Sequence, residues 1–168
     1  MNFIHFLFQD FYANKGNTKG KTVAFFFRMA NYASYKSEVK YILFPYLFFY
    51  KVLFEWIIGL ELPYNTKIGK GLIIYHIQAI IINKNSVIGE NLILRQSTTI
   101  GNKGQGGKSP TLGNNINIGS NVCIIGDIII GDNVNIGAGS VVVKDIPSNC
   151  TVVGNPARII KINTNKIQ

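Results

Sequence analysis

The sequence predicts an all-β core in which the chain winds as a single-stranded parallel β-helix, preceded by a short α-helical segment. Two observations carry this prediction. The composition changes near residue 62: most aromatic residues lie in residues 1–60, whereas glycine, asparagine and β-branched residues dominate residues 66–160. In that second region aliphatic residues recur at every sixth position, a period that fits neither a helix nor an isolated strand.

These changes divide the chain into three parts. We expect a helical N-terminal segment over residues 1–61, a β-helix domain over residues 62–162 and a C-terminal tail over residues 163–168. A length of 168 residues suits one domain with an appended segment.

The six-residue period is clearest in the second half of the chain. Its aliphatic positions are Leu112, Ile118, Ile124, Ile130, Ile136 and Val142. Glycine directly follows four of these residues, namely Leu112, Ile118, Ile130 and Ile136. Upstream, the same period gives Ile68, Ile74 and Ile80, followed after a one-residue insertion by Val87 and Ile93.

Each repeat is expected to form a short strand and a corner, so that three repeats close a triangular coil of about 18 residues. The aliphatic residue points inward, and the neighbouring glycine or asparagine allows a tight corner with positive φ. Successive coils pair as parallel strands about 4.8 Å apart. Because a coil covers only its neighbours, both ends need caps. We expect the aromatic N-terminal segment to cap one end, and Pro147 or Pro156 to mark the exit at the other.

The N-terminal segment contains an uncharged run over residues 41–50, bounded by Lys40 and Lys51. Ten residues fall well short of the roughly 20 that span a bilayer. Pro45 is expected to kink or restart a helix there. We expect this segment to pack on the protein or on a neighbouring subunit. The alternative is an interfacial helix, with peripheral membrane contact through residues 36–60.

The net charge of +9 favours an anionic partner such as a membrane surface or a phosphate-bearing cofactor, although it also serves simple solubility. Nucleic-acid binding is not predicted, because the basic residues are scattered and no reading motif is present. Cys123 and Cys150 lie in no CxxC motif or histidine cluster, so we expect reduced thiols and no metal site. The first ten residues lack the features of a secretory signal, and we expect a cytoplasmic protein, either free or at the inner face of the membrane.

Two stretches, residues 136–142 and 154–160, resemble the hexapeptide-repeat acyltransferases. Residues 67–76 and 94–101 resemble serine acetyltransferases more particularly, and the similarity covers about residues 61–161. The N-terminal segment is shorter than in typical serine acetyltransferases and closer in size to relatives in surface-polysaccharide pathways. This resemblance implies a left-handed helix, and a homotrimer with active sites in the grooves between subunits.

The resemblance also implies a catalytic histidine. His76 falls on the histidine that serine acetyltransferases use as a base, whereas His5 lies in the N-terminal segment. Histidine ordinarily titrates near neutral pH, which suits removal of a proton from an acceptor hydroxyl. Glu61 matches an aspartate of the family's site and is expected to orient His76.

The residues expected to bind the acceptor depart from the serine acetyltransferase pattern. Tyr75 replaces an aspartate before the histidine, and Lys108 and Ser109 replace the arginine and histidine of an Arg-His-Pro motif. Lysine keeps the charge of arginine but loses its bidentate fork. The loop over residues 101–109 does not match a phosphate-binding P-loop, and the resemblance implies instead a loop that covers a neighbouring subunit's active site.

The resemblance implies acetyl-CoA as co-substrate and no metal. Backbone at Gly119, Ser120, Gly137 and Ala138 is expected to lie beside the pantetheine arm, and Lys144, Arg158 and Lys161 to meet the phosphates.

The function predicted from these residues is O-acetylation of a hydroxyl on a sugar or surface polysaccharide. The alternative is serine O-acetylation in cysteine biosynthesis. Two further possibilities are N-acetylation of an amino sugar and a non-catalytic scaffold.

Overall fold

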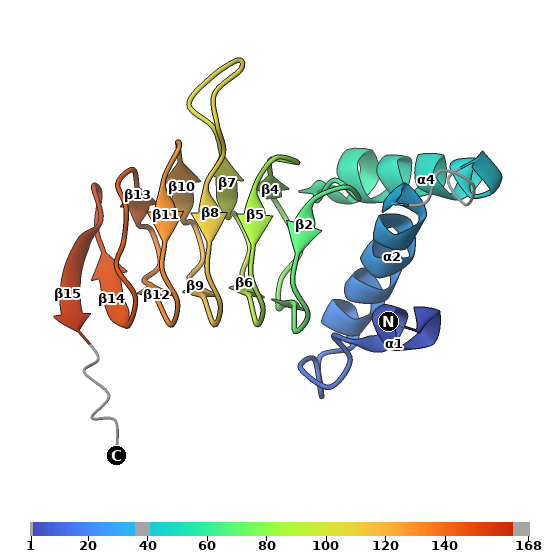
Figure 1. Cartoon of the computed structure of the whole chain (residues 1–168), viewed down its shortest axis with the longest axis horizontal. Helices are drawn as coiled ribbons and strands as arrows, with labels where there is room; N and C mark the ends of the chain where they lie inside the picture. The colour runs from blue at the N-terminus through green and yellow to red at the C-terminus, as the bar shows by residue number, and fades with distance from the viewer. Residues whose placement is uncertain (1, 36–40, 163–168) are drawn as a thin grey trace.

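The computed structural model describes residues 2–35 and 41–162, and shows a three-sided prism with helices packed at one end (Figure 1). The expected tail over 163–168, and residues 36–40 of the expected membrane-contacting segment, lie outside the described residues. The helical elements are α1 (Phe3–Phe8), α2 (Thr18–Tyr35), α4 (Phe44–Lys51) and the π-helical η1 (Val52–Ile58). Short strands follow, separated by corners.

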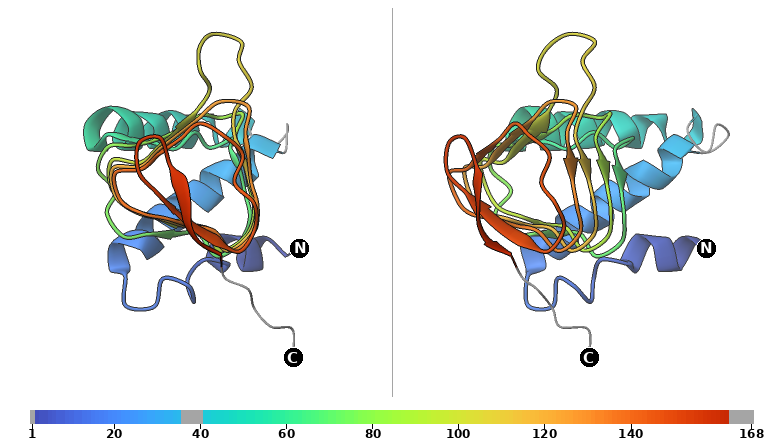
Figure 2. Two further views of the ribbon diagram at one scale, coloured as in Figure 1. Left: turned by 90° about the vertical axis from the view of Figure 1, so that its left-hand side faces the viewer. Right: turned by 60° about the vertical axis from the view of Figure 1, so that its left-hand side comes forward.

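Parallel strands form the three faces of the prism, which Figure 2 shows end-on. Sheet A contains β1 (Leu60–Glu61), β4 (Ile80–Ile82), β7 (Thr99–Gly101), β10 (Cys123–Ile125) and β13 (Val141–Val142). Sheet B contains β2 (Lys67–Ile68), β5 (Val87–Ile88), β8 (Thr111–Leu112) and β11 (Ile129–Ile130). Sheet C contains β3 (Ile73–Ile74), β6 (Ile93–Leu94), β9 (Asn117–Ile118), β12 (Asn135–Ile136), β14 (Cys150–Val153) and β15 (Arg158–Ile162). The last strand, β15, is antiparallel to β14 and ends the described solenoid.

The core is a set of stacked aliphatic side chains inside the prism. The later repeats follow the expected register, but the prediction for the second coil was wrong by one residue. Val87 is 43% exposed, whereas Ile88 beside it is 3% exposed, and Leu94 rather than Ile93 is fully buried. The reason is a two-residue insertion before β4, where Ile80 and Ile82 both point inward. In an extended strand, a shift of one residue turns a side chain to the other face.

The glycines that follow the aliphatic residues serve a different purpose from the one expected. Gly113, Gly119, Gly131 and Gly137 are not among the glycines with positive φ. Instead, backbone of the next coil passes so close to Gly119 that an added Cβ would lie 2.5 Å from the amide nitrogen of Ala138. These glycines therefore allow close stacking of successive coils.

Asparagine occupies five of the seven described non-glycine positions with positive φ. Asn91, Asn115, Asn133 and Asn149 each adopt φ near +60° at the corner between sheets B and C. Their side chains form a ladder in which each amide donates to the next Oδ1 at 2.8 Å. These asparagines therefore tolerate the left-handed backbone conformation, and their ladder stabilises the stacking of successive coils.

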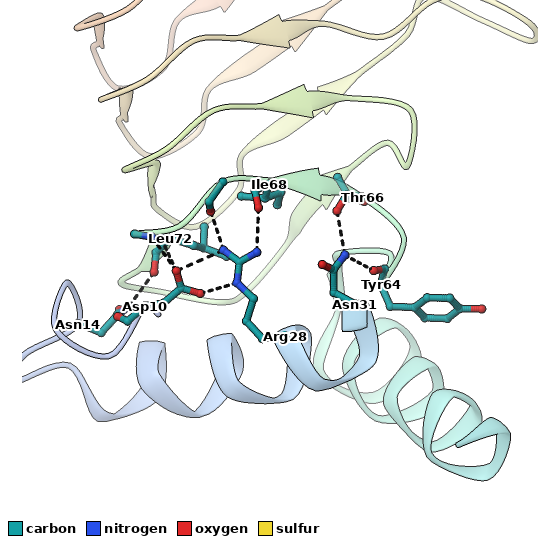
Figure 3. A network of polar contacts seen from close by, with 10 residues as sticks. Asp10, Asn14, Arg28, Asn31, Tyr64, Thr66, Ile68 and Leu72 are labelled. Atoms are coloured by element: carbon teal, nitrogen blue, oxygen red, sulfur yellow. Dashed lines mark hydrogen bonds and ion pairs between the residues drawn. The ribbon is translucent and has the colours of Figure 1, made fainter. Parts of the chain in front are cut away.

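Polar side chains of the N-terminal segment cover the open edge of the first coil (Figure 3). Arg28 on α2 donates to the carbonyl oxygens of Ile68 and Gly69, at 2.8 and 2.6 Å. Asn14 donates to the carbonyl of Leu72 at 2.7 Å, and Asn31 to the carbonyl of Tyr64 at 2.6 Å. The edge groups that a preceding coil would pair are thus paired by side chains.

A buried ion pair organises this cap. Arg28 and Asp10 are 1% and 0% exposed, and the Arg28 guanidinium donates to both carboxylate oxygens of Asp10, at 2.7 and 3.2 Å. Asp10 also accepts from the backbone amides of Gly71 and Leu72, at 2.7 and 3.0 Å. The cap is therefore a connected network, and it confirms the expected role of the N-terminal segment.

The second half of the helical segment has an apolar exposed face. Pro45 lies in the first turn of α4, so the helix restarts there as expected. The large hydrophobic side chains exposed on α4 and η1 are Phe44, Phe48, Phe49, Trp56 and Ile57. Among the described residues, no helix is both long enough and apolar enough to span a membrane.

We expect Asp10→Ala to lower the free energy of unfolding by about 3–5 kcal/mol, because it leaves the Arg28 charge buried without its partner. Urea denaturation followed by circular dichroism, at one protein concentration, measures this loss. The matched control is Glu90→Ala, which removes the exposed ion pair to Lys70 and is expected to change stability by at most about 1 kcal/mol. Equal small losses from both substitutions would show that the cap is not organised by the buried pair.

Candidate active site

His76 lies at the corner between sheets C and A in the first coil, two residues after β3. Its side chain is exposed. The next residue, Ile77, packs against the core and lines an apolar groove between α2 and η1. The histidine therefore sits at the junction of the prism and the helical segment, open to a ligand.

Strand register places several predicted site residues on the same corner as His76. Ile74 pairs with Leu94, Ile118 with Ile136, and Ile136 with Val152. Two residues beyond these partners, the corner carries His76, Gln96, Ser120 and Ala138 in successive coils. With about 4.8 Å per coil, this corner row extends about 14 Å from His76 to Ala138.

Backbone contacts hold the row together. The amide of Gly139 donates to the carbonyl of Ser120 at 2.9 Å, and Gly119 packs directly on the backbone of Gly137 and Ala138. The four residues predicted from the resemblance to lie beside a pantetheine arm therefore form one narrow surface, with small side chains that leave room for an extended ligand.

Gln96 and Arg95 were missed in the sequence analysis. Gln96 lies in the row directly beyond His76, and its Oε1 is buried without a hydrogen-bond partner. Because buried polar atoms are normally hydrogen-bonded, this oxygen lacks a partner that the single chain does not supply. Strand register would have identified Gln96. The first two coils pair with an offset of 20 residues, and Gln96 lies 20 residues after His76.

Arg95 fixes the surroundings of Tyr75. Its guanidinium lies 5.4 Å from the centroid of the Tyr75 ring, and it also donates to Asn117 Oδ1 and to the carbonyl of Ile118, at 2.7 and 2.8 Å. Tyr75 remains 44% exposed next to His76. The position therefore presents a half-exposed aromatic ring, held from behind by a cation.

Glu61 lies on the exposed side of β1, opposite Ile81 of β4. Neither a hydrogen bond nor an ion pair joins Glu61 to His76 among the described residues. Burial raises the pKa of Glu55 on η1, Lys51 lowers it, and Glu61 raises it further. Glu61 thus interacts electrostatically with Glu55, and its expected action on His76 stays a prediction.

The loop between β7 and β8 projects from the prism, as expected (Figure 1). Lys108 is exposed and forms an ion pair with Asp127 at 3.1 Å. Ser109 is buried at the base of the loop, and its Oγ has no hydrogen-bond partner. Neither residue lies in the corner row of His76 in this chain.

A cavity of about 220 Å³ lies at the far end of the prism, lined by Lys144, Pro156, Ala157, Arg158 and three residues of the last coil. Lys144 and Arg158 therefore lie together, as a pair of phosphate ligands requires. Lys161 is exposed on β15 opposite Thr151, outside the lining of this cavity.

Both cysteines are free thiols, and burial raises the pKa of Cys123 and of Cys150. Neither thiol is therefore activated as a nucleophile. Within residues 2–35 and 41–162, no group of three or more metal-ligating side chains comes together.

Comparisons with known proteins agree with this geometry. Residues 109–144 match the family model for bacterial transferase hexapeptide (six repeats). The chain is 38% identical over 158 residues to the putative colanic acid biosynthesis acetyltransferase WcaB of Escherichia coli K12, covering 91% of this chain and 98% of that protein. It is 41% identical over 104 residues to serine acetyltransferase of Synechococcus elongatus, covering 61% of this chain and 43% of that protein.

Solved structures of serine acetyltransferases are similar to this chain in fold. Soybean serine acetyltransferase matches with a TM-score of 0.80 and 27% identity, over 94% of this chain and 69% of that one. Serine acetyltransferase of Brucella abortus in complex with coenzyme A matches with a TM-score of 0.79 and 26% identity, over 95% of this chain and 68% of that one. These matches confirm the left-handed β-helix that the resemblance implied.

The chain belongs to the hexapeptide-repeat transferase family. Within that family it is an acetyltransferase of the serine acetyltransferase type.

We expect Gly119→Ala to lower the free energy of unfolding by about 1–3 kcal/mol, because its Cβ would collide with the backbone of Ala138. Thermal and urea unfolding measure the effect. Gly101→Ala is the matched control within the same prism, since its nearest neighbour would be Asn83 Cβ at 3.8 Å. If the two variants lose the same stability, close stacking is not the reason for glycine at position 119.

Proposed function

We propose that the protein transfers an acetyl group from acetyl-CoA to a hydroxyl of a saccharide, with His76 as general base. The observation that carries this proposal is the corner row, which connects His76 through Ser120 and Ala138 to the end of the prism where Lys144 and Arg158 lie. Acetyl-CoA extended along the row, with its phosphates at Lys144 and Arg158, brings its thioester to His76.

In the transfer, His76 accepts the proton of the acceptor hydroxyl as that oxygen attacks the thioester carbonyl. The new carbon–oxygen bond forms and the carbon–sulfur bond breaks. The thiolate of CoA leaves and takes up the proton from His76. Glu61 orients His76, and Gln96, which follows His76 in the row, contributes its unpartnered amide to binding of the pantetheine arm.

The residues around His76 favour a saccharide over L-serine. An amino acid brings both an ammonium and a carboxylate, and Tyr75 supplies no negative charge for the ammonium. Lys108 keeps a positive charge at the loop but lacks the bidentate fork of arginine, so it is a poorer ligand for the carboxylate. A half-exposed tyrosine instead suits the mixed polar and apolar surface of a sugar ring. The E. coli relative is named for colanic acid biosynthesis, which agrees with this choice. Serine O-acetylation is the alternative.

The base role of His76 predicts that His76→Ala lowers kcat by at least about 10²-fold while acetyl-CoA binding is retained. CoA release with sugars, short glycans and L-serine as acceptors measures turnover, and calorimetry measures binding. Unchanged kcat in the variant would contradict the mechanism. An amide product would indicate N-acetylation. If the wild-type protein shows no measurable acetyl-CoA binding, a non-catalytic scaffold is favoured.

The protein is further proposed to form a homotrimer in which the loop over residues 101–109 covers the neighbouring subunit's site. Support comes from the outer face of sheet A, where Ile81 is 40% exposed. A cavity of about 410 Å³ on this face is lined in part by Glu61, Asn102 and Ile125. Light scattering is expected to give three times the chain mass of 18.7 kDa. A monomer at micromolar concentration would contradict this assembly.

A peripheral membrane contact through residues 36–60 is the last part of the proposal. Within this range, the described face contains Phe48, Trp56 and Ile57, and a net charge of +9 favours an anionic surface. The wild-type protein is expected to co-sediment with anionic lipid vesicles, and Trp56→Ser to reduce the bound fraction. Equal sedimentation of the two proteins would contradict the contact.

A further inference from the structure

A continuous apolar track begins beside His76 and crosses the N-terminal turns of α2. Its first part is a groove of about 270 Å³ lined mainly by Val23, Phe26, Leu53, Phe54, Ile58 and Ile77. Its second part, of about 410 Å³, is lined by Phe8, Phe11, Phe25 and Phe26. Thr18, Thr22 and Phe26 border both parts, so the two grooves adjoin.

The track is built before any ligand arrives. Phe26 contacts Phe54 and Phe25 with ring centroids 5.8 and 5.9 Å apart, and the Tyr46 hydroxyl donates to the carbonyl of Phe26 at 2.7 Å. These contacts hold the walls in place, so a ligand does not have to order them.

The charges at the edge of the track are all positive. Lys19 borders the first groove and Lys21 the second, with the hydroxyls of Thr18 and Thr22 between them, and no acidic side chain is among the residues that line either groove. An apolar floor with cations and hydroxyls along one edge suits a long hydrocarbon chain that ends in a phosphate.

The position of the track relates it to the reaction. Ile77 lines the first groove, and its Cα is about 3.8 Å from that of His76, because the two residues are consecutive. One end of the track therefore lies at the residue next to the proposed base. The corner row leaves His76 in another direction, along the prism, so the two surfaces would hold different substrates.

We propose that this track binds the hydrocarbon chain of a lipid-phosphate-linked saccharide and presents its sugar to His76. This inference rests on the proposed function and names the class of acceptor. Phosphate lies near Lys19, the chain follows the apolar floor toward Phe8 and Phe11, and the sugar lies over Tyr75. The proposed membrane contact through α4 and η1 would place the same track beside the bilayer from which such an acceptor comes.

Direct binding tests the track without any turnover. Calorimetry with the full chain uses farnesyl phosphate, farnesol and inorganic phosphate as separate probes. Farnesyl phosphate is expected to bind, farnesol to bind about tenfold more weakly, and inorganic phosphate not to bind detectably. No binding of farnesyl phosphate to a folded protein overturns the proposal.

Two variants locate the site. Thr22→Trp is expected to fill the track and to weaken farnesyl phosphate binding by at least about tenfold, and the exposed position of Thr22 leaves folding intact. Lys19→Ala is expected to reduce farnesyl phosphate binding to the level of farnesol, whereas Lys67→Ala, on the exposed face of sheet B, is the matched control without effect. Unchanged farnesyl phosphate binding in Thr22→Trp overturns the proposal. If this variant also loses its oligomeric state while binding is intact, the groove is a contact between subunits.

Activity separates this inference from the proposed function. With the same sugar offered free and linked to farnesyl phosphate, Thr22→Trp is expected to raise KM for the linked acceptor alone. Equal KM values for the two acceptors in the wild-type protein overturn the inference while leaving O-acetylation in place. Absence of turnover with both acceptors counts against the proposed function, and the farnesyl phosphate titration then still decides whether the track binds a lipid phosphate.

Discussion

The hydrogen bonds between successive coils are the interaction on which the fold and the site both depend. Parallel pairing of each strand with the next sets one register along sheet C, from Ile74 through Ile136 to Val152. That register stacks the aliphatic core inside the prism and, at the same time, aligns His76, Gln96, Ser120 and Ala138 on one outer corner. The geometry of the candidate site is therefore a consequence of stacking, and substitutions that disturb stacking are expected to disturb that site.

A stack of coils has an unpaired edge at each end, and the N-terminal segment covers the first one. The Arg28–Asp10 pair and the amides of Asn14 and Asn31 replace a missing coil, which is why charged groups are buried there. The same packing places η1 and α2 beside Ile77, so the cap also forms one wall of the proposed acceptor track. Capping and the proposed binding of the acceptor thus involve the same helices.

The sequence predicted the fold well because the period is local and repeated, and residues such as Ile118, Ile130 and Ile136 point inward as expected. The prediction of inward-pointing residues was wrong at Val87 and Ile93, because the period does not show where an insertion of two residues lies. It also missed Arg95 and Gln96, whose relation to Tyr75 and His76 appears only when coils are paired. The cap network could not be predicted from the sequence, because Asp10, Arg28 and Ile68 are far apart in the chain.

In the proposed complex, acetyl-CoA lies along the corner row with its sulfur at His76. A crystal structure of the protein with CoA tests this most directly. We expect the phosphates at Lys144 and Arg158, and the pantetheine arm along Ala138 and Ser120. The sulfur is expected close to the His76 imidazole, leaving room for an attacking hydroxyl about 3–3.5 Å from the thioester carbon. CoA bound on another face of the prism, or with its sulfur at a corner without His76, would contradict this binding mode.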